Sequence, residues 1–145
     1  MSEVERFLSK KDEREIIQAI REAELDTSGE IRVHIEKGLG SDPMERAQEL
    51  FHDLKMDNTR DSNGVLLYIA VHDHRFAICG DRGICDVVPD DFWDTTRDLI
   101  EGHFKEHSFK EGIIAGVRSA GAKLRAHFPW HPDDPNELTD EISKG

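Results

Sequence analysis

The clearest hydrophobic pattern in the chain is an unbroken apolar run, rich in β-branched side chains, from Val65 to Val71. Such a run is typical of a strand that is covered on both faces. Residues 75–79 form a second, shorter strand pattern, and the polar residues 72–74 lie between the two. This spacing predicts an antiparallel hairpin.

A strict alternation of apolar and polar side chains predicts another strand over residues 30–36. Ile31, Val33 and Ile35 share one face of this strand, and we expect that face to be buried. His34 belongs to the opposite, polar face, where we expect an exposed surface histidine.

Two segments before the hairpin show apolar residues at helical spacing. Ser9 is a favourable N-cap for the first of them. Asp42 followed by Pro43 predicts the start of the second, which we expect to reach about Lys55.

Two further helices are predicted after the hairpin. The first begins at Pro89 or Asp90, and the second is opened by the capping box 108–111 and runs to Phe128. The predicted buried stripe of the first comprises Phe92, Trp93, Thr96, Leu99, Ile100, His103 and Phe104. In the second, Gly112, Gly116 and Gly121 leave a smooth strip, which predicts close packing against a neighbouring element.

A strand, a helix and a second strand with a continuous apolar run predict a βαβ crossover with parallel strands. The hairpin adds an antiparallel strand, so the fold class is α/β with a mixed sheet. The length of 145 residues fits one domain, which we place at residues 1–129. Residues 130–145 are rich in Asp, Pro and Asn, and we expect an acidic C-terminal tail on the surface.

The charge balance limits the partners. A net charge of −12 disfavours nucleic acid and anionic membranes, because both would repel the chain. No apolar run approaches the roughly 20 residues of a membrane span, and the N-terminus lacks a signal-peptide pattern, so we expect a cytoplasmic monomer. Cys79 and Cys85 would then be reduced thiols, with Cys79 buried in its strand.

Three stretches carry a specific resemblance, namely residues 27–33, residues 63–83 and the segment that begins at Asp90. With the order of elements they resemble the TPM domain family. The resemblance implies a three-layer sandwich, with helices on both faces of the central sheet. It also implies one of several functions, since members are described as binding calcium or other divalent ions, as weak acid phosphatases, or as adaptors for membrane complexes. We expect this chain to depart from many members in having no membrane anchor, and it has Gly-Asp-Arg-Gly at 80–83 where they have Gly-x-Gly.

Acidic residues are predicted to gather at one end of the sheet. The parallel strands begin at the same edge, and the hairpin returns the chain to that edge after its second strand. Carboxylate, amide and carbonyl oxygens are the ligands that calcium prefers. The sequence therefore predicts a site for Ca²⁺ or another divalent cation, with the candidate ligands Glu30, Asp61, Asn63, Asp81, Asp86, Asp90 and Asp91.

Two other functions are open from the sequence. A phosphatase would need a bound metal to supply the electrophile and the water, because Cys79 and Cys85 lack the cradle of a covalent phosphatase. A module that binds a basic protein partner would use the acidic surface without a metal. The His-x-x-Glu-His pattern at 103–107 matches one class of zinc protease, but so short a pattern is weak evidence of zinc catalysis.

Overall fold

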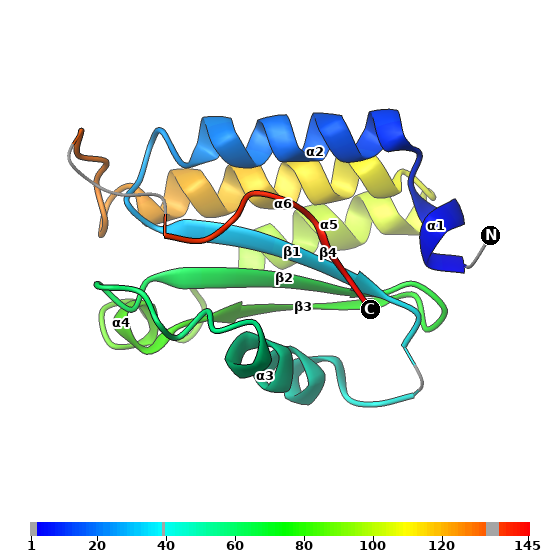
Figure 1. Ribbon diagram of the computed structural model, residues 1–145, viewed down its shortest axis with the longest axis horizontal. Helices are drawn as coiled ribbons and strands as arrows, with labels where there is room; N and C mark the ends of the chain where they lie inside the picture. The colour runs from blue at the N-terminus through cyan, green and yellow to red at the C-terminus, as the bar shows by residue number, and fades with distance from the viewer. Residues whose placement is uncertain (1–2, 39, 133–136) are drawn as a thin grey trace.

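A four-stranded sheet runs through the centre of the computed structural model, which describes residues 3–38, 40–132 and 137–145 (Figure 1). Its strands are β1 (Glu30–Glu36), β2 (Gly64–Ala70), β3 (Arg75–Gly80) and β4 (Ser143–Lys144), in the order β3-β2-β1-β4. β1 and β2 are parallel, and β2 and β3 are antiparallel. Both the predicted βαβ crossover and the predicted hairpin are confirmed.

Helices cover both faces of this sheet (Figure 1). One face carries α2 (Lys10–Ala23), α5 (Asp94–Lys105) and α6 (Phe109–Leu124), while α3 (Pro43–Asp53) packs on the other face. The short helices α1 (Glu3–Phe7) and α4 (Arg82–Cys85) lie at opposite ends of the molecule, and the sequence analysis predicted neither. The predicted α/β fold with helices on both faces is confirmed.

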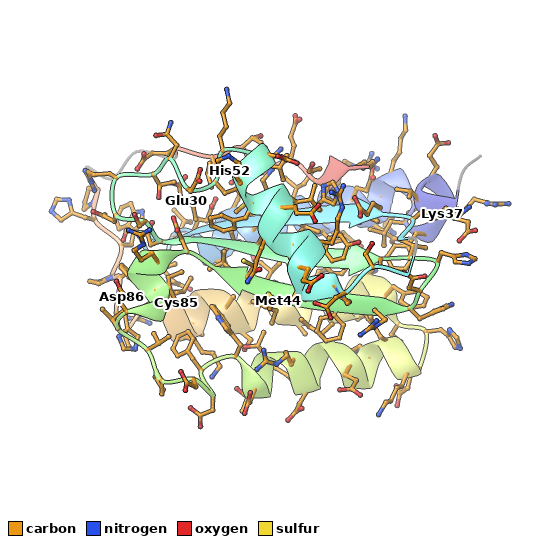
Figure 2. All side chains as sticks on the ribbon, turned by 90° about the horizontal axis from the view of Figure 1, so that it is seen from below. Glu30, Lys37, Met44, His52, Cys85 and Asp86 are labelled. Carbon is orange, nitrogen blue, oxygen red and sulfur yellow. The ribbon has the colours of Figure 1, made fainter. Side chains whose placement is uncertain are left out.

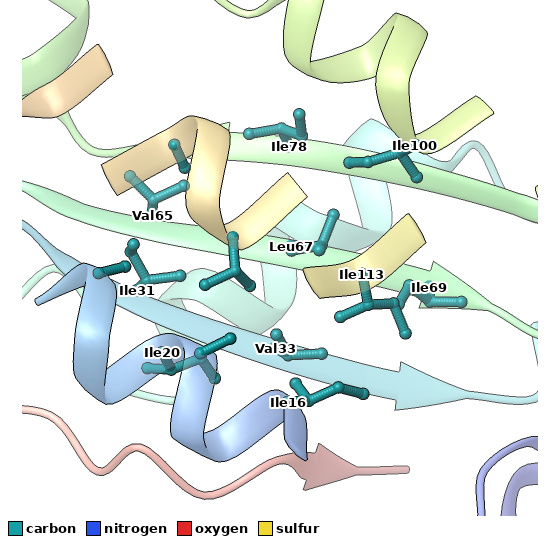
Figure 3. Close-up of a cluster of buried hydrophobic side chains, with 14 of the residues drawn as sticks. Ile16, Ile20, Ile31, Val33, Val65, Leu67, Ile69, Ile78, Ile100 and Ile113 are labelled. Carbon is teal, nitrogen blue, oxygen red and sulfur yellow. The ribbon is translucent and has the colours of Figure 1, made fainter. Parts of the chain in front are cut away.

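The two faces of the sheet have separate hydrophobic clusters. Figure 3 shows the larger one, in which Ile16 and Ile20 of α2 pack on Val33 of β1. The smaller cluster joins α3 to β2 and β3 and includes Phe51 and Tyr68. Every residue of β2 is buried, as its unbroken apolar run predicts.

The glycines of α6 form the predicted seam. A Cβ on Gly121 would lie 2.8 Å from Cβ of Ala23 in α2, and a Cβ on Gly112 would lie 2.8 Å from the ring of Phe104 in α5. The missing side chains allow α6 to press against a helix on either side, so the prediction of close packing is confirmed.

The helix ends agree with the sequence in part. Ser9 caps α2 in a reciprocal capping box with Asp12, and the Asp42 carboxylate caps α3 by accepting from the Glu45 amide at 3.0 Å. Ser108 makes no side-chain cap bond, so the capping box predicted for α6 is wrong.

The boundaries and burial of the last two long helices also need correction. α6 ends at Leu124 rather than at Phe128, and α5 begins at Asp94 rather than at Pro89 or Asp90. Residues 90–93 form tight turns, with the Phe92 amide bonded to the Pro89 carbonyl at 3.1 Å, instead of a first helical turn. Leu99 is 46% exposed, because the buried face of α5 is a narrow stripe along Thr96 and Ile100.

The C-terminal segment contributes to the sheet, which its composition did not predict. β4 pairs with β1 in parallel, with Ser143 opposite His34 and Lys144 opposite Ile35. Within the part of the segment that the structure describes, Leu138 packs on the α3 cluster and Ile142 on the larger cluster.

Candidate functional site

The start of β2 and the end of β3 meet at one end of the sheet, as the hairpin predicts. Val65 pairs with Gly80, and the amide of Asp81 donates to the Gly64 carbonyl at 2.9 Å. A Cβ on Gly83 would collide with the carbonyl oxygens of Asp61 and Ser62. The turn of α4 therefore lies directly on the backbone that leads into β2.

Asp81 is the most unusual side chain at this end. Its Oδ1 accepts a hydrogen bond from the Arg82 amide at 2.7 Å. Its Oδ2 is buried and has no hydrogen-bond partner among the residues that the structure describes. A buried carboxylate oxygen without a partner is costly, and it is also a ready ligand for a cation.

Two other predicted ligands lie on the adjacent loop. Asn63 is buried, and its Nδ2 donates to Ser28 Oγ at 3.3 Å while its carbonyl accepts from the Glu30 amide at 3.3 Å. Asp61 is exposed, with Oδ2 at 3.4 Å from Nη2 of Arg60. The structure thus brings Asp61, Asn63 and Asp81 onto adjoining segments.

The remaining predicted ligands lie around this end without converging on it. Asp86 is the exposed C-cap of α4, and Asp90 and Asp91 are exposed in the turns before α5. Figure 2 shows Glu30 and Asp86 toward the same end of the molecule, with Lys37 at the other end. Over residues 3–38, 40–132 and 137–145, no group of three or more His, Cys, Asp or Glu side chains is arranged to hold a metal ion.

The side chain of Glu30 is engaged by the C-terminal segment. Its Oε1 accepts from the Leu138 amide at 2.6 Å, and Glu137 and Asp140 lie near enough to act on it electrostatically. Burial, together with these two negative neighbours, raises the pKa of Glu30 to about 6 despite the stabilising backbone hydrogen bonds.

Glu24 was not singled out from the sequence. It follows α2 as its C-cap, and its Oε2 accepts from the Ile31 amide at 3.1 Å. Burial and a side-chain hydrogen bond to Asp140 raise its pKa to about 9. No local signal in the sequence points to Glu24, because its partner lies more than a hundred residues away in the C-terminal segment.

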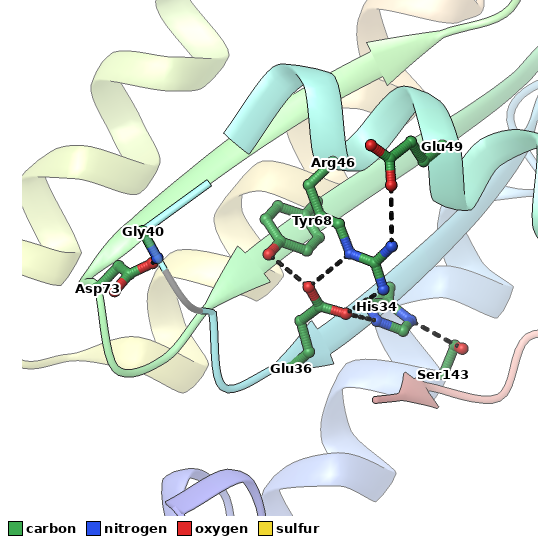
Figure 4. Close-up of polar contacts among 8 residues, drawn as sticks. All are labelled: His34, Glu36, Gly40, Arg46, Glu49, Tyr68, Asp73 and Ser143. Carbon is green, nitrogen blue, oxygen red and sulfur yellow. Dashed lines mark hydrogen bonds and ion pairs between the residues drawn. The ribbon is translucent and has the colours of Figure 1, made fainter. Parts of the chain in front are cut away.

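A polar network lies on the α3 face of the sheet, near the C-terminal end of β1 (Figure 4). Arg46 of α3 donates to both oxygens of Glu36, at 2.8 and 3.0 Å, and the Tyr68 hydroxyl donates to Glu36 Oε2 at 2.8 Å. His34 bridges Glu36 and Ser143, with each of its ring nitrogens 2.9 Å from one of them. The network ties α3 and β4 to the central strands.

His34 is therefore buried, at 3% exposure, and the prediction of a surface histidine is wrong. β4 lies beside β1 in the sheet at this point, and the side chains of Ser143 and Glu36 contact the His34 ring, which alternation within β1 could not indicate. Burial lowers the pKa of His34, so the ring is neutral at pH 7. With Nε2–H donating to the Glu36 carboxylate, Nδ1 is left to accept from the Ser143 hydroxyl.

Burial alone would raise the pKa of Glu36, but hydrogen bonds from Arg46, His34 and Tyr68 outweigh it and lower the pKa to about 2. Glu36 is thus a fully satisfied carboxylate with no oxygen left for an ion. We assign the network a structural role.

The cysteines and the histidine motif add no site. Cys79 and Cys85 are free thiols, and burial raises the pKa of the half-buried Cys79 to about 11. In the motif at 103–107, His103 is half-buried while Glu106 and His107 are exposed at the end of α5. No helix in the described part of the chain is long and apolar enough to cross a membrane.

Comparison with solved structures finds a similar protein over the full length of both chains. The BA42 protein from the psychrophilic bacterium Bizionia argentinensis, solved by NMR, is 54% identical, covers 100% of each chain and has a TM-score of 0.92. Among curated proteins, the comparison found no match.

More distant structures share the fold. The N-terminal domain of a P. gingivalis protein is 20% identical over 86% of this chain and 82% of its own, with a TM-score of 0.70. The N-terminal domain of cg2496 from Corynebacterium glutamicum is 14% identical over 95% of this chain and 81% of its own, with a TM-score of 0.64. The family model of the TPM domain matches residues 2–123, and the chain therefore belongs to the TPM domain family.

Proposed function

We propose that this TPM-domain protein binds a divalent cation, with Ca²⁺ as the first candidate, at the end of the sheet where α4 lies on the loop before β2. The observation that carries the proposal is the buried Oδ2 of Asp81, which has no hydrogen-bond partner within the described residues. A cation would supply the missing partner and offset the desolvation of the carboxylate.

Neighbouring groups can complete the ligand set. Asp61 and Asn63 lie on the loop that α4 contacts, and Asp86, Asp90 and Asp91 follow on exposed segments close in sequence. Calcium accepts roughly six to eight oxygens in irregular arrangements and keeps water where protein ligands are missing. The loops would therefore rearrange on binding, with Asp81 as the fixed ligand.

Glu30 has a different place in this proposal. Its side chain accepts from the Leu138 amide, so recruiting it to the cation would break that bond. We assign Glu30 to the docking of the C-terminal segment and keep Asp61, Asn63, Asp81, Asp86, Asp90 and Asp91 as ligands.

The test compares the unmodified protein with the Asp81→Asn variant during titration with Ca²⁺ and Mg²⁺. Asparagine keeps the oxygen that accepts from the Arg82 amide and removes the charge at Oδ2. Asp98→Asn, on the exposed side of α5, is the matched control. Melting temperature and amide NMR shifts are measured in each case.

We expect Ca²⁺ to raise the melting temperature of the unmodified protein and of Asp98→Asn, because ligand at a hundredfold excess over its Kd adds about 2.7 kcal/mol of stability. The largest shifts should fall on residues 61–64 and 80–86, and Asp81→Asn should lose both effects. Unchanged spectra and melting temperature in millimolar Ca²⁺ would remove the proposal.

A further inference from the structure

The C-terminal residues 137–145, which we call the strap, place negative charge against negative charge. The strap carries Glu137, Asp140 and Glu141, and it crosses the edge of β1 beside Glu24 and Glu30. Figure 1 shows this segment, in red, running along β1 to the C-terminus. Like charges at such short range oppose docking, so other contacts must hold the strap in place.

Backbone hydrogen bonds provide part of the attachment. The Gly145 amide donates to the Ile35 carbonyl at 2.9 Å, and the Leu138 amide donates to Glu30 Oε1 at 2.6 Å. The Glu137 carboxylate accepts from the Arg60 amide at 3.1 and 3.3 Å. An ion pair between Lys144 and Glu13 adds a contact to α2.

The contact between Glu24 and Asp140 is different in kind, because it joins two carboxyl groups. The Ile31 amide holds the Glu24 carboxyl at the edge of β1, and the Leu138 amide, bonded to Glu30, brings the strap to the same place, where the Asp140 side chain is only 12% exposed. Two ionised carboxylates have no hydrogen to share, so one of the pair must be protonated to donate. Glu24 is half-buried, and its Oε2 also accepts from the Ile31 amide at 3.1 Å.

The charged groups around this pair come from each element packed against it. α2 contributes Arg21, whose Nε lies 3.7 Å from Asp140 Oδ2, but the Arg21 side chain is 62% exposed. β1 contributes Glu30, and the strap contributes Asp140, whose charge acts on both glutamates. Two further charges of the strap act electrostatically on β1. Glu141 interacts with Arg32, and Glu137 interacts with Glu30. The net charge of the groups around Glu24 is negative, which favours the protonated form of its carboxyl group.

We propose that the strap is a proton-controlled device, which docks on the edge of β1 while Glu24 and Asp140 share a proton and undocks when that proton is lost. The family model ends at residue 123, so the strap lies outside the region that the model matches. Release would expose the backbone groups of the β1 edge.

The direction of the pH dependence follows from the two states. With the strap docked, burial and Asp140 raise the pKa of Glu24 from 4.5 to about 9. With the strap undocked, Glu24 loses its partner and its cover, and its pKa returns toward the ordinary value. Between these limits docking takes up a proton, so the docking constant falls by up to about tenfold for each unit of rising pH.

The experiment is an NMR titration of the full chain from about pH 5 to about pH 10, the range over which a group with this shift titrates. Amide signals of Leu138 and residues 143–145 report docking, the ¹³C signal of the Glu24 carboxyl reports its proton, and methyl signals of Ile113 report the core. Glu24→Gln keeps a donor for Asp140 but does not titrate. Glu22→Gln makes the same change at an exposed position on α2 and is the control.

We expect the strap signals of the unmodified protein and of Glu22→Gln to move toward undocked values together with Glu24, while the Ile113 methyls stay unchanged. In Glu24→Gln the strap signals should stay docked across the range. Asp140→Asn, which can donate to an ionised Glu24, should also stay docked, and it serves as a second variant if Glu24→Gln does not fold. Strap signals that stay constant in the unmodified protein, or that move equally in all variants, would overturn the proposal.

Discussion

Gly116 of α6 lies directly against Ile100 of α5, so closely that a Cβ on Gly116 would fall 2.6 Å from Ile100 Cδ1. Ile100 is fully buried and touches the centre of the larger cluster, which leaves it little room to move. The contact fixes how near the two helices approach.

Gly116→Leu should therefore destabilise the domain by roughly 1–3 kcal/mol through overpacking, measured by urea unfolding. The matched control is Gly102→Ala on α5, where a Cβ would meet nothing within 4 Å. That change should stabilise the protein by about 0.5–1 kcal/mol through helix propensity. A stabilised Gly116→Leu variant would show that the seam opens more easily than the packing suggests.

Glu36→Gln should lower the free energy of unfolding by about 1.5–3 kcal/mol, because it removes charge-assisted hydrogen bonds from Arg46 and leaves that guanidinium without its main partner. Glu49→Gln changes the other carboxylate that Arg46 contacts, at 3.2 Å, but Glu49 is 65% exposed. Glu49→Gln should lower the free energy of unfolding by less than about 1 kcal/mol. Equal losses in the two variants would contradict the structural role of Glu36.

The same carboxylate should shape the acid side of the stability profile. The pKa of Glu36 is lowered from 4.5 to about 2 in the folded protein, so its contribution is fully present above pH 4.5 and is lost as the pH falls toward 2. Urea midpoints measured against pH should therefore show a shallower acid decline in Glu36→Gln than in the unmodified protein. On the alkaline side the variant should stay less stable by a constant amount, with an unchanged slope against pH, since Glu36 is already ionised there.

Hydrolysis of an aryl phosphate should be very slow or absent. The described structure offers no activated nucleophile, and the acidic end of the sheet repels a phosphate dianion unless a cation intervenes. Turnover is measured with and without Ca²⁺ or Mg²⁺, in the unmodified protein and in Asp81→Asn. Strong metal-independent activity that is lost in Cys79→Ser would contradict this expectation.

The parts of the fold that local patterns determine could be predicted from the sequence. Alternation gave the bounds of β1 as residues 30–36, and the apolar run with its turn gave the hairpin. The glycine spacing in α6 gave the seam. Ser108 shows the limit of such patterns, because its side chain can cap α6 but makes no such bond in the structure.

The candidate site was predictable where it depends on the backbone. Hairpin geometry placed Asp81 beside the loop of Asp61 and Asn63, and the structure agrees, although ion binding there stays a prediction. The surroundings of Glu24, Glu30 and His34 were not predictable, since all three depend on the strap. A short polar segment with neither strand length nor periodicity gives no signal of where it docks.

The pairing of β4 with β1 also bears on how the domain folds. The contact between His34 and Ser143 spans 109 residues, whereas the hairpin and the α5–α6 pair join near neighbours along the chain. Closing so long a loop has a larger entropic cost, and only a strand of two residues offsets that cost here. The core can thus be complete before this edge strand attaches, and the strand can detach while the core stays intact. Hydrogen exchange at the Gly145 amide would then measure this local opening, and exchange in β2 would measure global unfolding.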